Sequence, residues 1–267
     1  MSLADREWRL IAEDVRPGPL QMALDEVAAE TAGNGGPATL RVYRWRPSTV
    51  SLGYSQSPSI LDSDYCDREG IDVTRRPTGG GTIYHDDFGD ISYSIVVPAD
   101  AVPGDLMESY RLLCDPLFDA LERLGIDAEY VEAERPAVFE PACYLRALHP
   151  AHDVVGPDGR KLSGNAQYRQ REAVVQHGSL SFERTPKRHL SVFEECDVDE
   201  DRFGERVGAV TDYTEVSRAE AVGTLAETLG EWADAHEGSW TDEELATARE
   251  RVATKYGNPP WVAGDGA

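Results

Sequence analysis

Apolar side chains recur every three or four positions in four stretches of the chain, and this spacing predicts four helices. The stretches are residues 18–31, 105–124, 217–236 and 241–256. The last two begin at capping boxes, in which Ser217 is followed by Glu220 and Thr241 by Glu244, so that each pair satisfies free N–H groups of the first turn. Pro116 lies inside the second stretch, where it can kink the helix.

Other stretches alternate apolar and polar residues, which is the pattern of half-buried strands. They are residues 39–45, 49–54, 90–97, 153–155, 160–163 and 173–182. A short strand from residue 72 and the start of another near residue 84 lie on either side of a glycine run. Arg46–Ser48 is the expected turn between the first two, and Gly156–Gly159 predicts a hairpin. Because the strands alternate with isolated helices, we expect an α+β fold with a mixed or antiparallel sheet and flanking helices.

Length and cysteine use narrow the class of protein. The 267 residues fit one large domain, with or without a small appendage, that needs no disulfides. No apolar run approaches the roughly 18 residues of a membrane span, and the charged start lacks the apolar segment of a signal peptide. The four cysteines, Cys66, Cys114, Cys143 and Cys196, form no C-x-x-C pair, which argues against a zinc ribbon or a thioredoxin-type site. We therefore expect a cytoplasmic protein.

The charge balance is strongly acidic. Aspartate and glutamate total 49 against 26 lysines and arginines, a net charge of −23, and the only lysines are Lys161, Lys187 and Lys255. Such a surface repels nucleic acids and anionic membranes, so neither is an expected partner. It resembles the surfaces of proteins from salt-loving organisms, although an acidic soluble protein of another origin would also fit. On the halophilic interpretation, low salt should destabilise the fold.

The most informative stretch is Arg75–Asp86, which reads Arg-Arg-Pro-Thr-Gly-Gly-Gly-Thr-Ile-Tyr-His-Asp. Three glycines between two strand-like segments allow a ligand to approach the main-chain N–H groups closely. Arg75 and Arg76 could fork onto phosphate or carboxylate oxygens. The stretch is not a phosphate-binding loop of the G-x-x-x-x-G-K-[ST] type. A tight turn with two surface arginines is the alternative interpretation.

Three ordered motifs resemble those of the lipoate-protein ligase A family and of the octanoyltransferases in the same superfamily, which also contains the biotin ligases. They are Arg75–Asp86, then Gly-Arg-Lys-Leu-Ser-Gly-Asn-Ala-Gln at 159–167, and Gln-His-Gly-Ser-Leu at 176–180. Residues 8–10, 22–26, 255–256 and Trp261 also match the family. The resemblance implies a biotin/lipoate ligase-like catalytic domain over residues 1–256, with a helical C-terminal part at 217–256 and a tail at 257–267.

By this resemblance the protein is an enzyme that attaches a lipoyl or octanoyl group to a lysine of another protein. It implies that Lys161 contacts the acyl carbonyl or an acyl-adenylate, where an ammonium would stabilise the negative charge of acyl transfer. A solvated strand lysine is the alternative. The residues implied to bind substrate are Arg75, Arg76, Thr78, Gly79, Gly80, Gly81, His85, Gly164, Asn165, Ala166, Gln167, His177, Gly178 and Ser179.

The histidines also have plainer interpretations. His85 could be a general base or a buried structural residue, and His177 is expected to order the backbone of its strand. His149 and His152 lie in a loop without other metal-binding side chains at ligand spacing. We expect no metal held by protein side chains, although ATP could bring Mg²⁺ to the site.

Two mechanisms share this family's scaffold, and the motifs are mixed. A ligase activates lipoate with ATP, whereas a transferase takes octanoyl from acyl carrier protein through a cysteine thioester. Gly81, Tyr84–Asp86 and Gly89-Asp90 resemble the ligases, because the similar transferases usually carry arginine in place of that glycine. The ligases' Gly-Arg-Asn-Asp element is absent, and Pro141–Tyr144 stands there instead, which places Cys143 where the transferase nucleophile is expected.

The resemblance to the pocket loop favours the ligase, with octanoyltransferase as the alternative and biotin-protein ligase or a non-catalytic acyl-binding protein as further alternatives. A ligase would use lipoate or octanoate with ATP and Mg²⁺, and it could need a small accessory subunit. The implied acceptors are the lipoyl domains of 2-oxoacid dehydrogenase E2 proteins or the glycine cleavage H protein. A transferase would also bind acyl carrier protein.

Overall fold

The structure is a computed structural model that describes residue 3 and residues 6–264. Its centre is an eight-stranded mixed sheet in the order β11-β1-β2-β6-β10-β9-β8-β7. Strand β1 is parallel to its neighbours β2 and β11, and every other pair in this sheet is antiparallel. These strands are β1 (Trp8–Arg16), β2 (Ala38–Trp45), β6 (Asp90–Pro98), β7 (Glu129–Tyr130), β8 (Asp153–Val155), β9 (Lys161–Arg169), β10 (Ala173–Ser181) and β11 (His236–Glu237).

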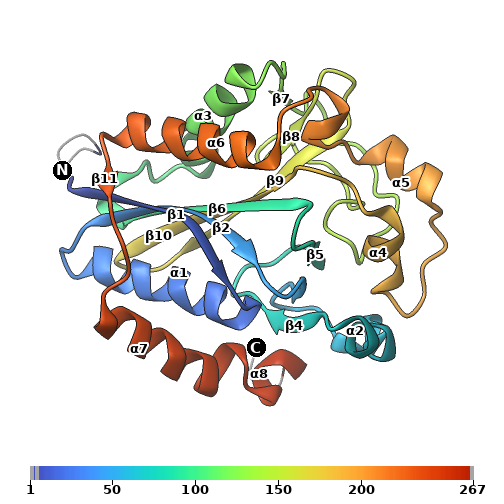
Figure 1. Ribbon diagram of the computed structural model, residues 1–267, viewed down its shortest axis with the longest axis horizontal. Helices are drawn as coiled ribbons and strands as arrows, with labels where there is room; N and C mark the ends of the chain where they lie inside the picture. The colour runs from blue at the N-terminus through green and yellow to red at the C-terminus, as the bar shows by residue number, and fades with distance from the viewer. Residues whose placement is uncertain (1–2, 4–5, 265–267) are drawn as a thin grey trace.

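Helices cover both faces of the large sheet (Figure 1). The α-helices of the described residues are α1 (Gly18–Gly33), α2 (Ser63–Glu69), α3 (Leu106–Arg123), α4 (Pro186–Ser191), α5 (Glu200–Arg206), α6 (Arg218–Ala233), α7 (Asp242–Arg251) and α8 (Pro259–Ala263). Helices α3 and α6 pack together on one face, and α1 and α7 lie on the other. The two apolar layers bury side chains such as Leu117 and Leu225 on the first face and Leu24 on the second, which holds the sheet rigid beneath the cavity described below.

A smaller sheet lies beside the large one and carries the glycine run. It contains β3 (Thr49–Leu52) between β4 (Asp72–Arg75) and β5 (Ile83–His85), with β3–β4 parallel and β3–β5 antiparallel. The predicted turn at Arg46–Ser48 therefore joins strands of two different sheets. The glycine run spans from β4 to β5, and its conformation is fixed by both neighbours.

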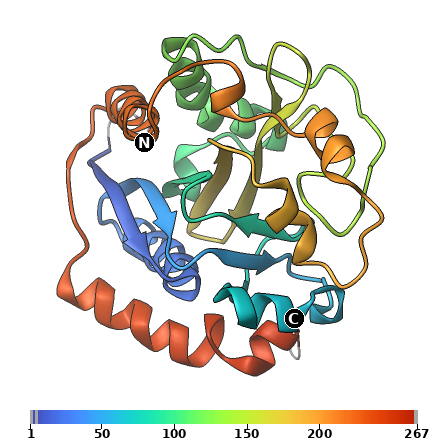
Figure 2. The same ribbon diagram turned by 45° about the vertical axis from the view of Figure 1, so that its right-hand side comes forward.

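The C-terminal segment differs from the predicted tail. Helix α7 continues into a π-helical turn, Val252–Tyr256, runs along the outside of α1 and leads to α8, which packs on β4 (Figure 2). The Trp261 indole N–H donates to the Arg75 carbonyl at 3.0 Å. Residues 257–264 are thus part of the folded domain, while 265–267 lie outside the described residues. Both predicted capping boxes form, at Ser217 and Thr241.

Candidate active site

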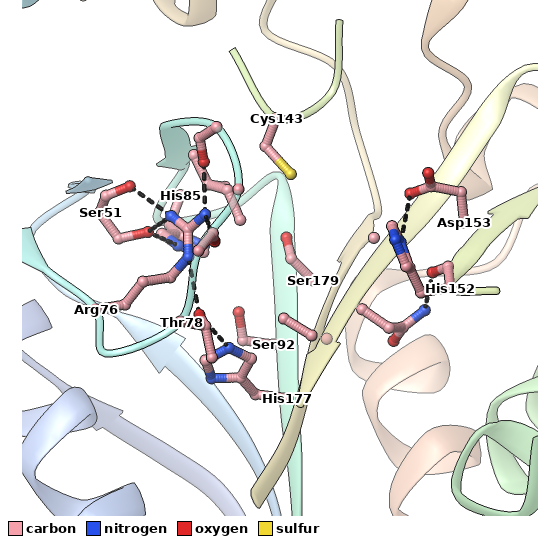
Figure 3. A pocket seen from close by; sticks show the side chains of 18 of the residues that line it. Ser51, Arg76, Thr78, His85, Ser92, Cys143, His152, Asp153, His177 and Ser179 are labelled. Atoms are coloured by element: carbon pink, nitrogen blue, oxygen red, sulfur yellow. Dashed lines mark hydrogen bonds and ion pairs between the residues drawn. The ribbon is translucent and has the colours of Figure 1, made fainter. Parts of the chain in front are cut away.

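A cavity of about 300 Å³ opens between the large sheet and the small one. The glycine run and β5 form one wall, β9 and β10 form another, and the loop that carries Cys143 closes the top (Figure 3). The cavity lining includes all but one of the residues that the motifs suggested: Arg76, Thr78, Gly79, Gly80, Gly81, His85, Cys143, Lys161, Gly164, Asn165, Ala166, Gln167, His177, Gly178 and Ser179. Segments 60 to 100 residues apart in the chain therefore meet around one space.

Arg76 shapes the glycine run. Its guanidinium has five N–H donors, and all are used inside the protein: by Thr78 Oγ1 and by the carbonyls of Gly79 and Gly81 in the run, and by the carbonyl and hydroxyl of Ser51 on β3. Arg76 would therefore have to exchange one of these partners to bind phosphate or carboxylate oxygens, and its role in substrate binding stays a prediction.

The glycines of the run are needed for its shape. Gly80 has φ +93°, which side chains with a Cβ rarely adopt. A Cβ on Gly81 would lie 2.6 Å from the backbone nitrogen of Cys143, so only glycine lets the run approach the Cys143 loop this closely.

Arg75 lies outside the cavity, contrary to the prediction. Its guanidinium donates to four main-chain carbonyls, those of Gly53, Tyr54, Trp261 and Val262. Burial lowers the pKa of Arg75. The side chain joins β4 to α8, which gives it a structural role that the motif did not reveal.

The Cys143 loop is held at its backbone, which leaves the thiol free. The Cys143 N–H donates to the Thr82 carbonyl at 2.8 Å, and the Cys143 carbonyl accepts from Lys161 Nζ at 3.1 Å. The next side chain, Tyr144, is hydrogen-bonded through its hydroxyl to Ser179 Oγ at 2.7 Å. With these anchors, the sulfur points into the cavity (Figure 3).

The thiol and the Lys161 ammonium flank the same point on β9. A Cβ built on Gly164 would lie 3.7 Å from Cys143 Sγ and 3.2 Å from Lys161 Nζ. The absence of a side chain at Gly164 therefore opens the space between a nucleophilic sulfur and a cation, where an acyl carbonyl could lie.

Lys161 is buried but charged. Its Nζ lies 2.8 Å from Asp153 Oδ1, and both side chains are almost fully buried. Burial by itself would lower the pKa of Lys161, but the neighbouring Cys143 and Asp153 raise it above its usual range. Burial likewise opposes ionisation of Asp153, yet Lys161 and His152 bring the pKa of that carboxyl well below normal. The site thus holds an ammonium–carboxylate pair beside the thiol.

Two histidines on the cavity wall are fixed by their neighbours. His85 stacks on Trp45 at 4.0 Å, with Nδ1 2.8 Å from Asp90 Oδ2 and Nε2 3.0 Å from Ser51 Oγ. Burial lowers the pKa of His85 despite Asp90, so the ring is neutral at pH 7.

His177 is fixed in a similar way. Its Nε2 lies 3.1 Å from Thr78 Oγ1, and its Nδ1 lies 3.5 Å from Asp25 Oδ2. This contact with Thr78 joins His177 to the start of the glycine run.

A family model described as the lipoyl protein ligase A/B catalytic domain matches residues 17–229. The chain belongs to this family. It is 33% identical to the octanoyltransferase LipM of Symbiobacterium thermophilum, over 96% of this chain and 98% of the relative. It is also 33% identical to the octanoyltransferase LipM of Kyrpidia tusciae, over 95% and 97% of the two chains.

Solved structures of family members share the fold. A lipoate-protein ligase A bound with ATP superposes with a TM-score of 0.80 at 27% identity, covering 97% of this chain and 99% of that one. The bipartite lipoate protein ligase of Thermoplasma acidophilum gives 0.78 at 28% identity, with 97% of both chains covered. The predicted family, its fold class and enzymatic role in protein lipoylation are confirmed. The LipM relatives support the transferase alternative better than the ligase that the pocket motif favoured.

Several cavity residues of this family member were missed by the motifs. They are Met22, Tyr43, Trp45, Ser51, Ile83, Ser92, Tyr110, Arg146, Ala147, His152 and Asp153. Most lie in predicted helices or strands, where their spacing indicated only the core. Asp153 had a usable signal, because a carboxylate at the start of a buried strand needs a cationic partner, and Lys161 stands across the hairpin.

Neither metal ligands nor membrane spans are found in the described part of the chain. Within residue 3 and residues 6–264, no group of three or more histidine, cysteine, aspartate or glutamate side chains is arranged to hold a metal ion. Over the same residues, no helix has the length and apolar character to cross a bilayer.

Proposed function

We propose that this protein is an octanoyltransferase that moves an octanoyl group from acyl carrier protein to a lysine of a lipoyl domain through a thioester on Cys143. The observation that carries the proposal is that the Cys143 thiol points into the cavity, with only the open position at Gly164 between it and the Lys161 ammonium. The similarity to LipM octanoyltransferases over almost the whole chain supports it.

The geometry suits two acyl transfers in sequence. In the first, the Cys143 thiolate attacks the carbonyl of the octanoyl thioester, and the thiolate of the carrier leaves. In the second, the amine of the acceptor lysine attacks the Cys143 thioester, and the Cys143 thiolate is released with an amide as product. Negative charge builds on the carbonyl oxygen in both steps, and the fixed ammonium of Lys161 can stabilise it at low cost in reorganisation.

The charges on the cavity wall favour this route over adenylate formation. All donors of Arg76 bind the protein itself, and Lys161 is paired with Asp153. Arg76 would have to release one of its partners within the protein before it could bind a triphosphate. The transferase route requires neither ATP nor Mg²⁺, whereas the similarity to an ATP-bound ligase keeps the ligase as the competing function.

The acceptor and the compartment follow from the same proposal. The T. acidophilum system pairs its ligase with an E2 lipoyl domain, and we propose that lipoyl domains of E2 or H proteins are the acceptors here. All four cysteines are free thiols, which suits a reducing cytoplasm. The charge of −23 suits concentrated salt, in which counterions screen carboxylate repulsion.

The two mechanisms are separated by their donors. The pure protein is incubated with a lipoyl domain and either octanoyl-acyl carrier protein or lipoate with ATP and Mg²⁺, and the acceptor is weighed by mass spectrometry. We expect octanoylation from the carrier protein and none in the Cys143→Ser variant. ATP-dependent lipoylation that persists in Cys143→Ser, without any octanoyl transfer, would establish the ligase instead.

A further inference from the structure

The second transfer needs a base, and this inference rests on the proposed function. The acceptor lysine is an ammonium at neutral pH, because its ordinary pKa is about 10.4. Forming the amide removes two protons from this nitrogen: one goes to solvent before the nitrogen attacks the Cys143 thioester, and the second is lost as the nitrogen–carbon bond forms. Some group in the cavity has to take up that proton.

Lys161 is unsuited to this task. It is already protonated, its Nζ is bound to Asp153 and to the Cys143 carbonyl, and both neighbours favour the charged form. Asp153 is equally unsuited, since the pairing with Lys161 lowers its pKa and so its basicity.

The other titratable groups on the cavity wall are also occupied. His85 has hydrogen-bond partners at both ring nitrogens, and His177 faces Thr78 and Asp25. Burial raises the pKa of Tyr110 to about 12, so this phenol stays protonated.

His152 is the remaining imidazole on the wall, and it is open. Its side chain is 35% exposed, and its Nδ1 lies 3.6 Å from Asp153 Oδ1. That nitrogen is buried without a hydrogen-bond partner, and Nε2 forms no hydrogen bond with any residue that the structure describes. An imidazole that turns Nδ1–H toward a carboxylate keeps Nε2 free to accept a proton.

The position of His152 is fixed by its surroundings. Its carbonyl accepts from both the backbone N–H and the side-chain amide of Asn165, at 3.2 and 3.0 Å. The ring stacks on His149 with centroids 5.1 Å apart and lies 5.7 Å from the ring of Tyr110, which comes from α3. Figure 3 shows His152 and Asp153 on the side of the cavity opposite Arg76 and His85.

We propose that His152 is the general base of the second transfer. Its Nε2 accepts the proton that the acceptor nitrogen loses while that nitrogen bonds to the acyl carbon. The bond between the acyl carbon and Cys143 Sγ then breaks, and its electron pair stays on sulfur. The imidazolium passes its proton to water, so the enzyme ends with a neutral His152 and with the Cys143 thiolate that the next loading step uses.

The two half-reactions are measured separately. Cys143 is first loaded from octanoyl-acyl carrier protein, and the loading rate is followed by intact mass. The isolated acyl-enzyme is then mixed with a lipoyl domain, and its single-turnover discharge is timed. For His152→Gln we expect loading at the wild-type rate and discharge slowed about a hundredfold or more.

His236→Gln is the matched control, because His236 is exposed on β11 and does not line the cavity, and both rates should stay close to those of the wild type. Free imidazole should partly restore the discharge of His152→Ala, which a loss of packing would not allow. The proposal is overturned if His152→Gln discharges as fast as the wild type, or if loading and discharge slow by the same factor. A wild-type protein that never forms the acyl-enzyme overturns the proposed function, and this inference with it.

Discussion

Replacing Asp153 with asparagine tests whether the buried ion pair keeps Lys161 charged. The substitution preserves the shape of the side chain but removes the negative charge 2.8 Å from Lys161 Nζ. The amide oxygen of the asparagine can still accept a hydrogen bond from the ammonium, as the Cys143 carbonyl does, but no negative charge remains beside it. Because Lys161 is 2% exposed, water replaces the lost carboxylate poorly.

The loss of unfolding free energy can be estimated from the two ways in which Lys161 can respond to the substitution. An ammonium left in place without its partner typically costs about 3–5 kcal/mol of unfolding free energy. The alternative is that Lys161 releases its proton. Its ordinary pKa of about 10.4 lies roughly 3.4 units above pH 7, and each unit corresponds to about 1.36 kcal/mol, so this release costs about 4.6 kcal/mol. The loss therefore stays below about 5 kcal/mol, and the melting temperature falls by roughly 6–20 °C.

The pH dependence has a defined sign. The folded pKa of Asp153 is lowered, so its stabilisation is present above the unfolded pKa of about 3.9 and is lost as pH falls through the folded value. The folded pKa of Lys161 is raised, so its stabilisation is present below the unfolded pKa of about 10.4 and is lost as pH rises through the folded value. The difference between wild type and variant should be largest between roughly pH 4 and 10.

Urea unfolding over this pH range and the loading rate of Cys143 are the two assays. We expect loading to slow about a hundredfold, because a neutral or displaced Lys161 no longer stabilises the oxyanion. Asp158→Asn is the control, since Asp158 pairs with Arg160 at the surface, where such pairs contribute about 1 kcal/mol or less. Equal stability of Asp153→Asn and wild type at pH 7, with unchanged loading, would refute the reasoning.

Three further predictions concern the cation, the glycine run and the acidic surface. Lys161→Arg should fold normally but lose about a hundred- to a thousandfold in transfer rate, because a planar guanidinium does not reproduce the ammonium position; near-normal turnover would contradict this. Gly80→Val should abolish loading, because valine at φ +93° distorts the run, whereas Gly79→Ala, whose Cβ meets nothing within 4 Å, should load normally. The melting temperature should rise from dilute to molar NaCl as carboxylate repulsion is screened, and a constant value would refute the halophilic interpretation.

The helices and strands that local pattern defines were predictable from the sequence. The capping boxes at Ser217 and Thr241 depend on residues three positions apart, and both form. The small sheet was harder to predict from the sequence, because β3 pairs with β4 and β5, and no local pattern encodes the register of these pairs. Helix α8 was missed for a related reason, since a helix of five residues is stable only through its packing on β4.

The site could be predicted where a motif determines the backbone conformation, but not where the orientation of a side chain depends on the rest of the fold. The glycine run, Lys161 and Cys143 meet in the cavity as expected. Arg75 and Arg76 are adjacent in sequence and chemically identical, yet Arg75 turns toward α8, some 186 residues away. That choice depends on carbonyl groups that only the folded chain brings together, and the short motif contains no trace of them.

The central claim is that octanoyl passes through Cys143, and isolating the loaded enzyme tests it most directly. The protein is incubated with octanoyl-acyl carrier protein, freed of the donor and digested at acidic pH, and the Cys143 peptide is weighed with and without hydroxylamine. A second portion of the loaded enzyme is mixed with a lipoyl domain. We expect an octanoyl group on Cys143 that hydroxylamine removes and that appears on the acceptor lysine without ATP. An unmodified Cys143 peptide from a preparation that still acylates the acceptor would contradict it.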